Sequence, residues 1–152
     1  MAHSSDKTES DHDGTDEAPA KGAAASLIDA VLDYLAFTGT PRPLSVLLDE
    51  APKRLAACVE AEVVSVYLLE GAGQELVMRG TAGFPAGAPG QVRLAVGEGI
   101  TGRAVATQRP IVAAEVTQHE AFVPAAELPE ARYPALAAIP LLAPLGPLGA
   151  VV

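Results

Sequence analysis

The chain has 152 residues and a net charge of −9, with 49% hydrophobic and 19% charged residues. This length suits one globular domain, and its core must be built mainly from Ala, Val and Leu because the chain has no Trp. An acidic chain offers no positive field for phosphate groups, so we expect neither a nucleic acid nor an anionic membrane surface as a partner.

Residues 1–25 are rich in Ser, Asp, Glu, Gly and Ala and show no apolar periodicity. Such a segment cannot bury enough surface to offset the entropy that it loses on ordering. We therefore predict a disordered acidic tail, in which His3 and His12 are solvated rather than metal ligands.

Two amphipathic helices are predicted after this tail. The first begins at Ser26 and ends near Gly39, and its apolar stripe consists of Leu27, Ile28, Val31, Leu32 and Leu35. In the second helix, the residues predicted to face inward are Leu44, Leu47, Leu48, Ala51, Leu55 and Val59. Pro52 lies inside this second helix and predicts a kink or a fresh helical start.

After Ala61 the apolar period changes from that of a helix to that of strands. Residues 62–70 and 74–81 are predicted to form a hairpin around Gly71 and Gly73. A Gly- and Pro-rich loop follows at 83–90, and residues 91–96 alternate polar and apolar as in a strand with one wet face. A short helix is predicted at 100–107, a strand at 110–116, and a loop with a helical turn at 117–133.

Residues 134–152 carry no charge, and the stretch is nearly as long as a membrane-spanning helix. Its four prolines would each break helical hydrogen bonding, so two strands at 136–142 and 148–152 fit better. We therefore predict no membrane span. Helices that precede a run of antiparallel strands are typical of the α+β class, which is the predicted fold class.

Residues 97–102 read Gly-Glu-Gly-Ile-Thr-Gly and match the dinucleotide-binding pattern G-x-G-x-x-G, with Glu115 near where a ribose-binding acid is expected. The preceding strand alternates, whereas a parallel nucleotide-binding strand is apolar throughout. The chain that remains is also too short for two βαβαβ halves. We therefore interpret the glycines as a tight strand-to-helix turn, whose free N–H groups could still hold an anionic ligand group.

Several segments resemble the GAF domain family. Residues 94–106 (LAVGEGITGRAVA) resemble its G-x-G-[IL]-x-G turn and short helix, and residues 110–112 (PIV) resemble the strand that follows. Residues 138–141 (AIPL) and 148–151 (LGAV) resemble two later strands, and residues 65–69 (SVYLL) the first. The similarity covers about residues 26–152. Within the family, the sequence most resembles the N-terminal sensory domain of nitrogen-type phosphoenolpyruvate–protein phosphotransferases.

The resemblance implies a GAF/PAS-like fold with a central antiparallel sheet of about six strands. N-terminal helices would cover one face of the sheet, and a short helix with loops would cover the other. It also implies a regulatory module of a larger enzyme, whose phosphotransfer domains have no counterpart in this sequence. Many GAF domains have Asp where Glu115 stands, and most end in a long helix after the last strand. We expect residues 26–152 to be a GAF domain truncated before that helix.

A ligand cavity between the sheet and residues 97–133 is also implied by the resemblance. The candidate ligand-binding residues are Tyr67, Met78, Gly99, Thr101, Phe122, Arg132, Tyr133 and Ile139. Arg132 could clamp a carboxylate, or it is an ordinary solvated surface residue. From the family resemblance and this set of residues, the expected ligand is an amino acid or a 2-oxo acid. We expect no metal and no cofactor.

Catalysis has little support in the sequence. Cys58 is the only cysteine, which excludes an intramolecular disulfide, and its place on a predicted helix indicates a buried, inert thiol. GAF-fold reductases of free methionine sulfoxide use several cysteines. The acidic N-terminus resembles no signal peptide, so a cytoplasmic location is expected.

Two functions stay open. The first is a non-catalytic sensor that binds a small metabolite and regulates an attached or partner signalling protein. The alternative is a homodimerisation module without a ligand, in which small residues permit close helix packing: Ala23, Ala24, Ala25 and Ala30.

Overall fold

The computed structural model describes residues 19–123 and 133–152. Helices α1 (Pro19–Gly39) and α2 (Leu44–Val59) come first, followed by a hairpin of β1 (Val64–Glu70) and β2 (Glu75–Ala82) around the 3-10 turn η1 (Gly71–Gly73). The later elements are β3 (Arg93–Ala95), α3 (Gly99–Thr107), β4 (Ile111–Ala113), the 3-10 turn η2 (Val116–Gln118), β5 (Leu136–Ala143) and β6 (Gly146–Val151). This order confirms the predicted α+β class.

The strands form one six-stranded sheet in the order β3-β2-β1-β6-β5-β4, and each neighbouring pair is antiparallel. The last strand, β6, lies in the middle of the sheet, where its Ala150 pairs with Tyr67 of β1. Nucleotide-binding folds of the doubly wound type need parallel strands. The antiparallel sheet therefore agrees with the interpretation of residues 97–102 as a structural turn.

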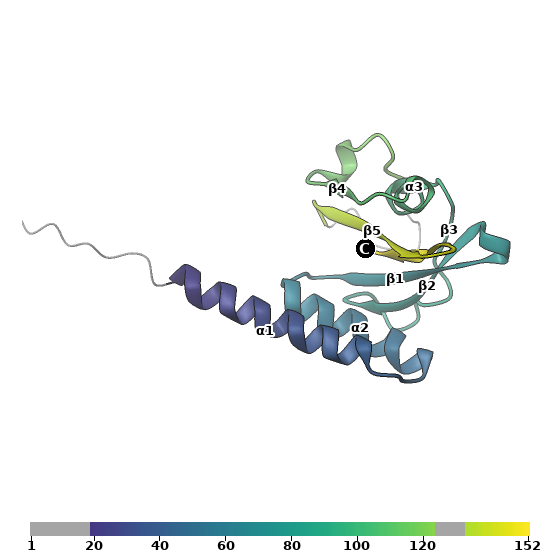
Figure 1. Cartoon of the computed structure of the whole chain (residues 1–152). Helices are drawn as coiled ribbons and strands as arrows, with labels where there is room; N and C mark the ends of the chain where they lie inside the picture. Colours follow the sequence, from purple (N-terminus) through teal and green to yellow (C-terminus); the bar gives the residue numbers. More distant parts are fainter. Residues whose placement is uncertain (1–18, 124–132) are drawn as a thin grey trace, which may run out of the picture.

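Helices cover both faces of this sheet. Figure 1 shows α1 and α2 on one face and α3 on the other. Helix α2 packs on β1 and β2, and α1 packs mainly on α2. The two layers approach most closely at Gly80 of β2, where an added Cβ would run into the backbone of Leu48 and the ring of Pro52. A glycine at this position lets the helix lie directly on the strand.

Helix α1 begins at Pro19, so Ser26 is wrong as its start. Proline suits the first helical position, and the alanine-rich stretch that follows has high helix propensity. The predicted stripe from Leu27 to Leu35 is present, but its five side chains are 40% to 59% exposed. Because α1 lies on α2 rather than on the sheet, much of its apolar surface stays open.

Helix α2 continues through Pro52, so the fresh helical start considered for this residue is wrong. Ala51 and Pro52 are buried against the sheet. Leu44 and Val59 are 58% and 54% exposed, which contradicts the prediction that they face inward. Periodicity identifies the apolar stripe of a helix, but it does not show where the surface beneath that stripe ends.

Cys58 on α2 is only half-buried, whereas the sequence predicted a buried thiol. The tyrosine at position 34 on α1 lies near it. Burial raises the pKa of the Tyr34 hydroxyl, and the nearby Cys58 adds to this effect. The thiol therefore sits at the contact between the two helices.

The predicted hairpin at 62–81 is confirmed, although β1 starts at Val64 and β2 extends to Ala82. Strands β3 and β4 have only three residues each, so they are shorter than predicted. Residues 136–151 form β5 and β6, as predicted for this uncharged stretch. No helix in the described ranges is long and apolar enough to cross a membrane.

Two buried clusters fill the space between the sheet and α3. The first joins strand residues to α3 and consists of Tyr67, Leu76, Met78, Val92, Val105 and Ala150. The second lies nearer β4 and β5 and consists of Ile100, Ala104, Ala113, Val116 and Ala138. Val152 packs against both clusters, so the end of β6 lies where the two meet.

Candidate functional site

A cavity of about 480 Å³ lies at the end of the sheet where β1 and β5 begin. This volume is within the range of small-molecule sites. Helix α2, the start of β1, the loop after β2 and the start of β5 all contribute to its wall. The lining residues are Leu55, residues 59–65, Tyr67, Phe84, Val116, residues 133–137, Ile139, Val151 and Val152.

The strand register places lining residues on both faces of the sheet. Ser65 and Val152 exchange two backbone hydrogen bonds, with N···O distances of 2.8 and 2.9 Å. Val151 pairs with Ile139, whereas Tyr67 pairs with the next residue, Ala150, so Tyr67 lies on the opposite face from Ile139. Tyr67, Ile139 and Val151 all line the cavity, which therefore reaches residues on both faces of the sheet.

Three aromatic side chains line the cavity. Tyr67 comes from β1 and is almost fully buried. Phe84 comes from the loop after β2, and Tyr133 directly precedes the start of β5. The rings of Phe84 and Tyr133 lie 6.0 Å apart at 76°, which is the favourable edge-to-face arrangement. This pair joins two loops that are far apart in the sequence.

The polar groups of the wall are few. The Ser65 hydroxyl lies 2.9 Å from the Thr81 hydroxyl, so it already has a hydrogen-bonding partner. Glu60 ends α2 in a left-handed conformation, and its N–H donates to the carbonyl of Ala56. Glu62 follows two residues later, at the entrance to β1. These two carboxylates are the charged groups of the described wall.

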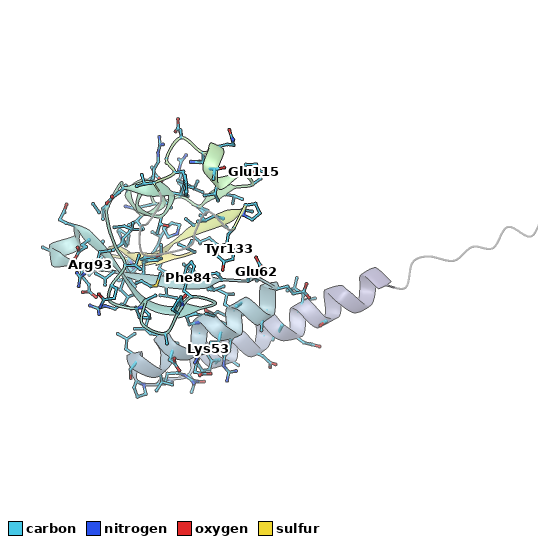
Figure 2. All side chains as sticks on the ribbon, turned by 180° about the vertical axis from the view of Figure 1, so that it is seen from behind. Lys53, Glu62, Phe84, Arg93, Glu115 and Tyr133 are labelled. Atoms are coloured by element: carbon cyan, nitrogen blue, oxygen red, sulfur yellow. The ribbon has the colours of Figure 1, made fainter. Side chains whose placement is uncertain are left out.

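The structure brings three of the predicted ligand-binding residues to this cavity. Tyr67, Tyr133 and Ile139 line it, although Ile139 lies on the opposite face of the sheet from Tyr67. Figure 2 shows Tyr133 beside Phe84 and near Glu62 in this part of the molecule. Arg132 lies outside the described residues.

The other predicted residues lie away from the cavity. Met78 is fully buried in the first core cluster, and Thr101 is buried within α3. Phe122 packs against the second core cluster. Gly99 begins α3, and a Cβ added there would come into contact with Ala121 and Val123. Met78 pairs with Tyr67 and shares its face, but neighbouring apolar side chains cover it.

Four further residues line the cavity without having been predicted from the sequence: Phe84, Val116 and the α2 residues Leu55 and Val59. Phe84 is a lone aromatic in a Gly- and Pro-rich loop, and its place in a loop is the signal that could have found it, because binding residues often lie on loops. No local signal marks Leu55 or Val59, since they belong to an ordinary apolar stripe.

The turn at residues 97–102 is tightly closed by its own backbone. The N–H of Gly97 donates to the carbonyl of Gly102, and the N–H of Gly102 donates to the carbonyl of Glu98, both at 2.9 Å. A Cβ on Gly102 would run into the carbonyl oxygen of Ala95. The glycines therefore serve close packing, as the sequence analysis interpreted them.

A second cavity, of about 690 Å³, lies between α2, β2 and the loop at 83–89. Its basic residues, Lys53 and Arg79, are already paired: Lys53 Nζ lies 2.9 Å from Asp49, and Arg79 Nε lies 2.6 Å from Glu70. This cavity is more polar than the first. The first cavity, with its aromatic wall, is the better candidate for a ligand site.

Comparison with known proteins agrees with this architecture. The chain is similar to the GAF domain of a phosphoenolpyruvate–protein phosphotransferase from Coxiella burnetii, with 24% identity, 84% of this chain and 76% of that chain covered, and a TM-score of 0.76. The corresponding domain from Acinetobacter shares 19% identity, with 82% of this chain and 73% of that chain covered, and a TM-score of 0.70. A free methionine-R-sulfoxide reductase from Neisseria meningitidis shares 18% identity, with 92% and 76% covered and a TM-score of 0.70.

No curated protein sequence matches the chain. The family model of the GAF domain matches residues 42–152, which is most of the chain and includes every strand of the sheet. GAF domains are generally sensory or regulatory. The sheet order, the helices on both faces and the family match lead to one conclusion: this chain belongs to the GAF domain family.

Proposed function

We propose that this chain is a non-catalytic sensory domain that binds a small metabolite in the cavity at the start of β1 and β5. The observation that carries the proposal is the cavity of about 480 Å³ with three aromatic side chains in its wall. Apolar walls with a few polar groups are typical of small-molecule sites. The wall also includes Leu55 and Val59 of α2, so an occupied cavity contacts the helical layer directly.

The chemistry of the wall supports a regulatory rather than a catalytic role. A nucleophile needs an adjacent base within hydrogen-bond reach. The Ser65 hydroxyl is bonded to Thr81, and no histidine is among the described lining residues. Cys58, the sole cysteine, is not among the residues that line the cavity.

The signalling context belongs to the proposal as well. Two of the similar structures are GAF domains of phosphoenolpyruvate–protein phosphotransferases. We propose a similar arrangement here, in which the domain regulates an attached or partner phosphotransferase. Amino acids and 2-oxo acids stay in the proposed ligand set, because Arg132 directly precedes the lining residue Tyr133.

The experiment that tests metabolite binding is isothermal calorimetry with folded protein against a panel of amino acids, 2-oxo acids and amines. A ligand at about 100 times its Kd should also raise the free energy of unfolding by about 2.7 kcal/mol. Replacing Tyr133 with Leu should lower the affinity of any ligand that binds in the cavity. Silence across the panel with folded protein would count against a metabolite sensor.

Dimerisation is the second candidate function, and one observation favours it. Leu27, Ile28, Leu32 and Leu35 on α1 are each at least 50% exposed. Exposed apolar surface of this kind on a helix is typical of a protein interface. Analytical ultracentrifugation over a range of concentrations tests this function, and a strict monomer at every concentration would contradict it.

A further inference from the structure

The described wall of the cavity carries negative charge and aromatic rings. Glu60 and Glu62 line it, and Glu115 directly precedes the lining residue Val116. Both Glu62 and Glu115 are exposed. No Lys or Arg is found among the lining residues within 19–123 and 133–152.

Two basic side chains outside the cavity wall, one on β2 and one on α3, are engaged by acids. Arg79 binds Glu70 through two hydrogen bonds of 2.6 Å, and Arg103 binds Glu120 at 2.6 Å. Figure 2 shows Arg93 away from Tyr133 and Glu62, and Lys53, which lines the second cavity together with Phe84, is paired with Asp49. A negatively charged ligand in the cavity would therefore meet carboxylates without a described counter-charge.

The wall offers complementary groups both to the apolar body and to the charged group of a positively charged ligand. Its body replaces water against apolar side chains such as Leu55, Val64 and Leu136. The faces of Phe84 and Tyr133 attract a cation through the negative charge of their π-systems. A nearby carboxylate such as that of Glu62 adds Coulomb attraction, and the overall charge of −9 favours the approach of cations.

We propose that the ligand of this cavity is an organic cation, either a primary amine or an alkylammonium group on an aliphatic or aromatic body. The aromatic pair Phe84–Tyr133 and the carboxylate of Glu62 receive the charged group. This inference rests on the proposed function, because it names the ligand class of the same site. It replaces the carboxylate-bearing ligand as the first choice, since the described wall offers a carboxylate no partner.

Three probes of nearly equal shape and different charge test the inference: benzylamine, benzyl alcohol and benzoate. Calorimetry with the full chain at low ionic strength is expected to give benzylamine the highest affinity, about fivefold or more above benzyl alcohol. Benzoate is expected to give no measurable heat. Raising the salt concentration to about 0.5 M should weaken benzylamine several-fold and leave benzyl alcohol unchanged, because salt screens only the charged ligand.

Glu62→Gln is the decisive variant, and Asp33→Asn is its matched control. Both changes remove one exposed carboxylate, but Asp33 lies on α1 and does not line the cavity. Glu62→Gln should weaken benzylamine about two- to fivefold without changing the affinity for benzyl alcohol. Phe84→Leu should weaken both probes, and circular dichroism of each variant shows whether it is folded.

The outcomes separate this inference from the proposed function. Benzoate that binds as tightly as benzylamine would overturn the preference for cations but support a small-molecule site. An equal loss of affinity in Glu62→Gln and Asp33→Asn would place the cation elsewhere on the surface and overturn the inference. If none of the three probes binds, the inference fails, and the metabolite panel alone decides the proposed function.

Discussion

At the scale of single residues, Gly80 fixes the distance between the helical layer and the sheet. A Cβ at this position would lie within 3.0 Å of the carbonyl carbon of Leu48 and 3.2 Å from the ring of Pro52. Backbone atoms cannot rotate away as a flexible side chain does. The contact therefore leaves α2 no room to accept a larger residue without shifting along β2.

Gly80→Ala should lower the free energy of unfolding by about 1–3 kcal/mol, since overpacking forces the backbone to move. Gly87→Ala is the control, because a Cβ there has no heavy atom within 4 Å and its φ is not positive. The control should be neutral or slightly stabilising. Urea denaturation of both variants measures the difference, and equal stabilities would contradict the close packing at Gly80.

The ion pair of Glu70 and Arg79 joins β1 to β2 at the surface. Hydrogen bonds from Arg79 lower the pKa of the Glu70 carboxyl and thereby raise the pKa of the Arg79 guanidinium. A carboxyl whose pKa is lowered in the folded state contributes stability above its unfolded pKa. This contribution disappears as the pH falls below about 4 and through the folded pKa.

Glu70→Gln should therefore reduce stability slightly at pH 7 and have a smaller effect at pH 3. The pair is exposed, so the change should be small at both pH values. Guanidinium would screen the pair, so urea is the right denaturant. An effect of Glu70→Gln that is larger at pH 3 than at pH 7 would contradict a stabilising role of the ionised Glu70 carboxylate.

At the scale of elements, the hairpin and the two helices were predictable because each has a local signal. Gly71 and Gly73 mark the turn between β1 and β2, and the change of period after Ala61 marks the end of the helices. The exposure of Leu44 and Val59 has no local signal, because it depends on which strands lie beneath α2. For the same reason, the pattern could not place Leu55 in the cavity wall.

The candidate site was predictable only in part. Tyr67 and Tyr133, which were predicted, do line the cavity. They could be predicted because a tyrosine combines an apolar ring with a polar hydroxyl, as a ligand site requires. Met78 and Thr101 were equally plausible from the sequence, but side chains from other elements cover them. Whether an apolar strand residue meets a cavity or a core depends on distant parts of the chain, which periodicity does not report.

Helix α1 presents the clearest test of assembly among the elements. Leu32→Glu places a charge in the middle of its exposed stripe, where Leu32 is 57% exposed. If α1 forms a homodimer interface, the change should raise the dissociation constant tenfold or more, because it buries an unpaired charge. Val112→Glu is the control on β4, where Val112 is 74% exposed. Sedimentation equilibrium measures the dissociation constant of each variant. Equal dissociation constants for the two variants would contradict an α1 interface.

At the scale of the whole molecule, β6 divides the sheet into two halves that meet at the cavity. Helix α2 contacts β1 and β2, whereas α3 contacts β5 and β6 on the opposite face. Figure 1 shows α2 on one side of the sheet and α3 on the other. The cavity touches α2, β1, β5 and β6 together, so a ligand bound there contacts both the helical layer and three neighbouring strands.

This arrangement predicts where a bound ligand changes the protein. With saturating benzylamine, amide hydrogen exchange should slow at residues 56–65, because the end of α2 and the start of β1 form the wall. Exchange at the hairpin tip, residues 71–75, should stay unchanged, since no residue there lines the cavity. If only residues 133–137 were protected, ligand binding would not change the exchange of α2. In that case α2 would not carry the signal, and the regulatory output would have to leave the domain through β5.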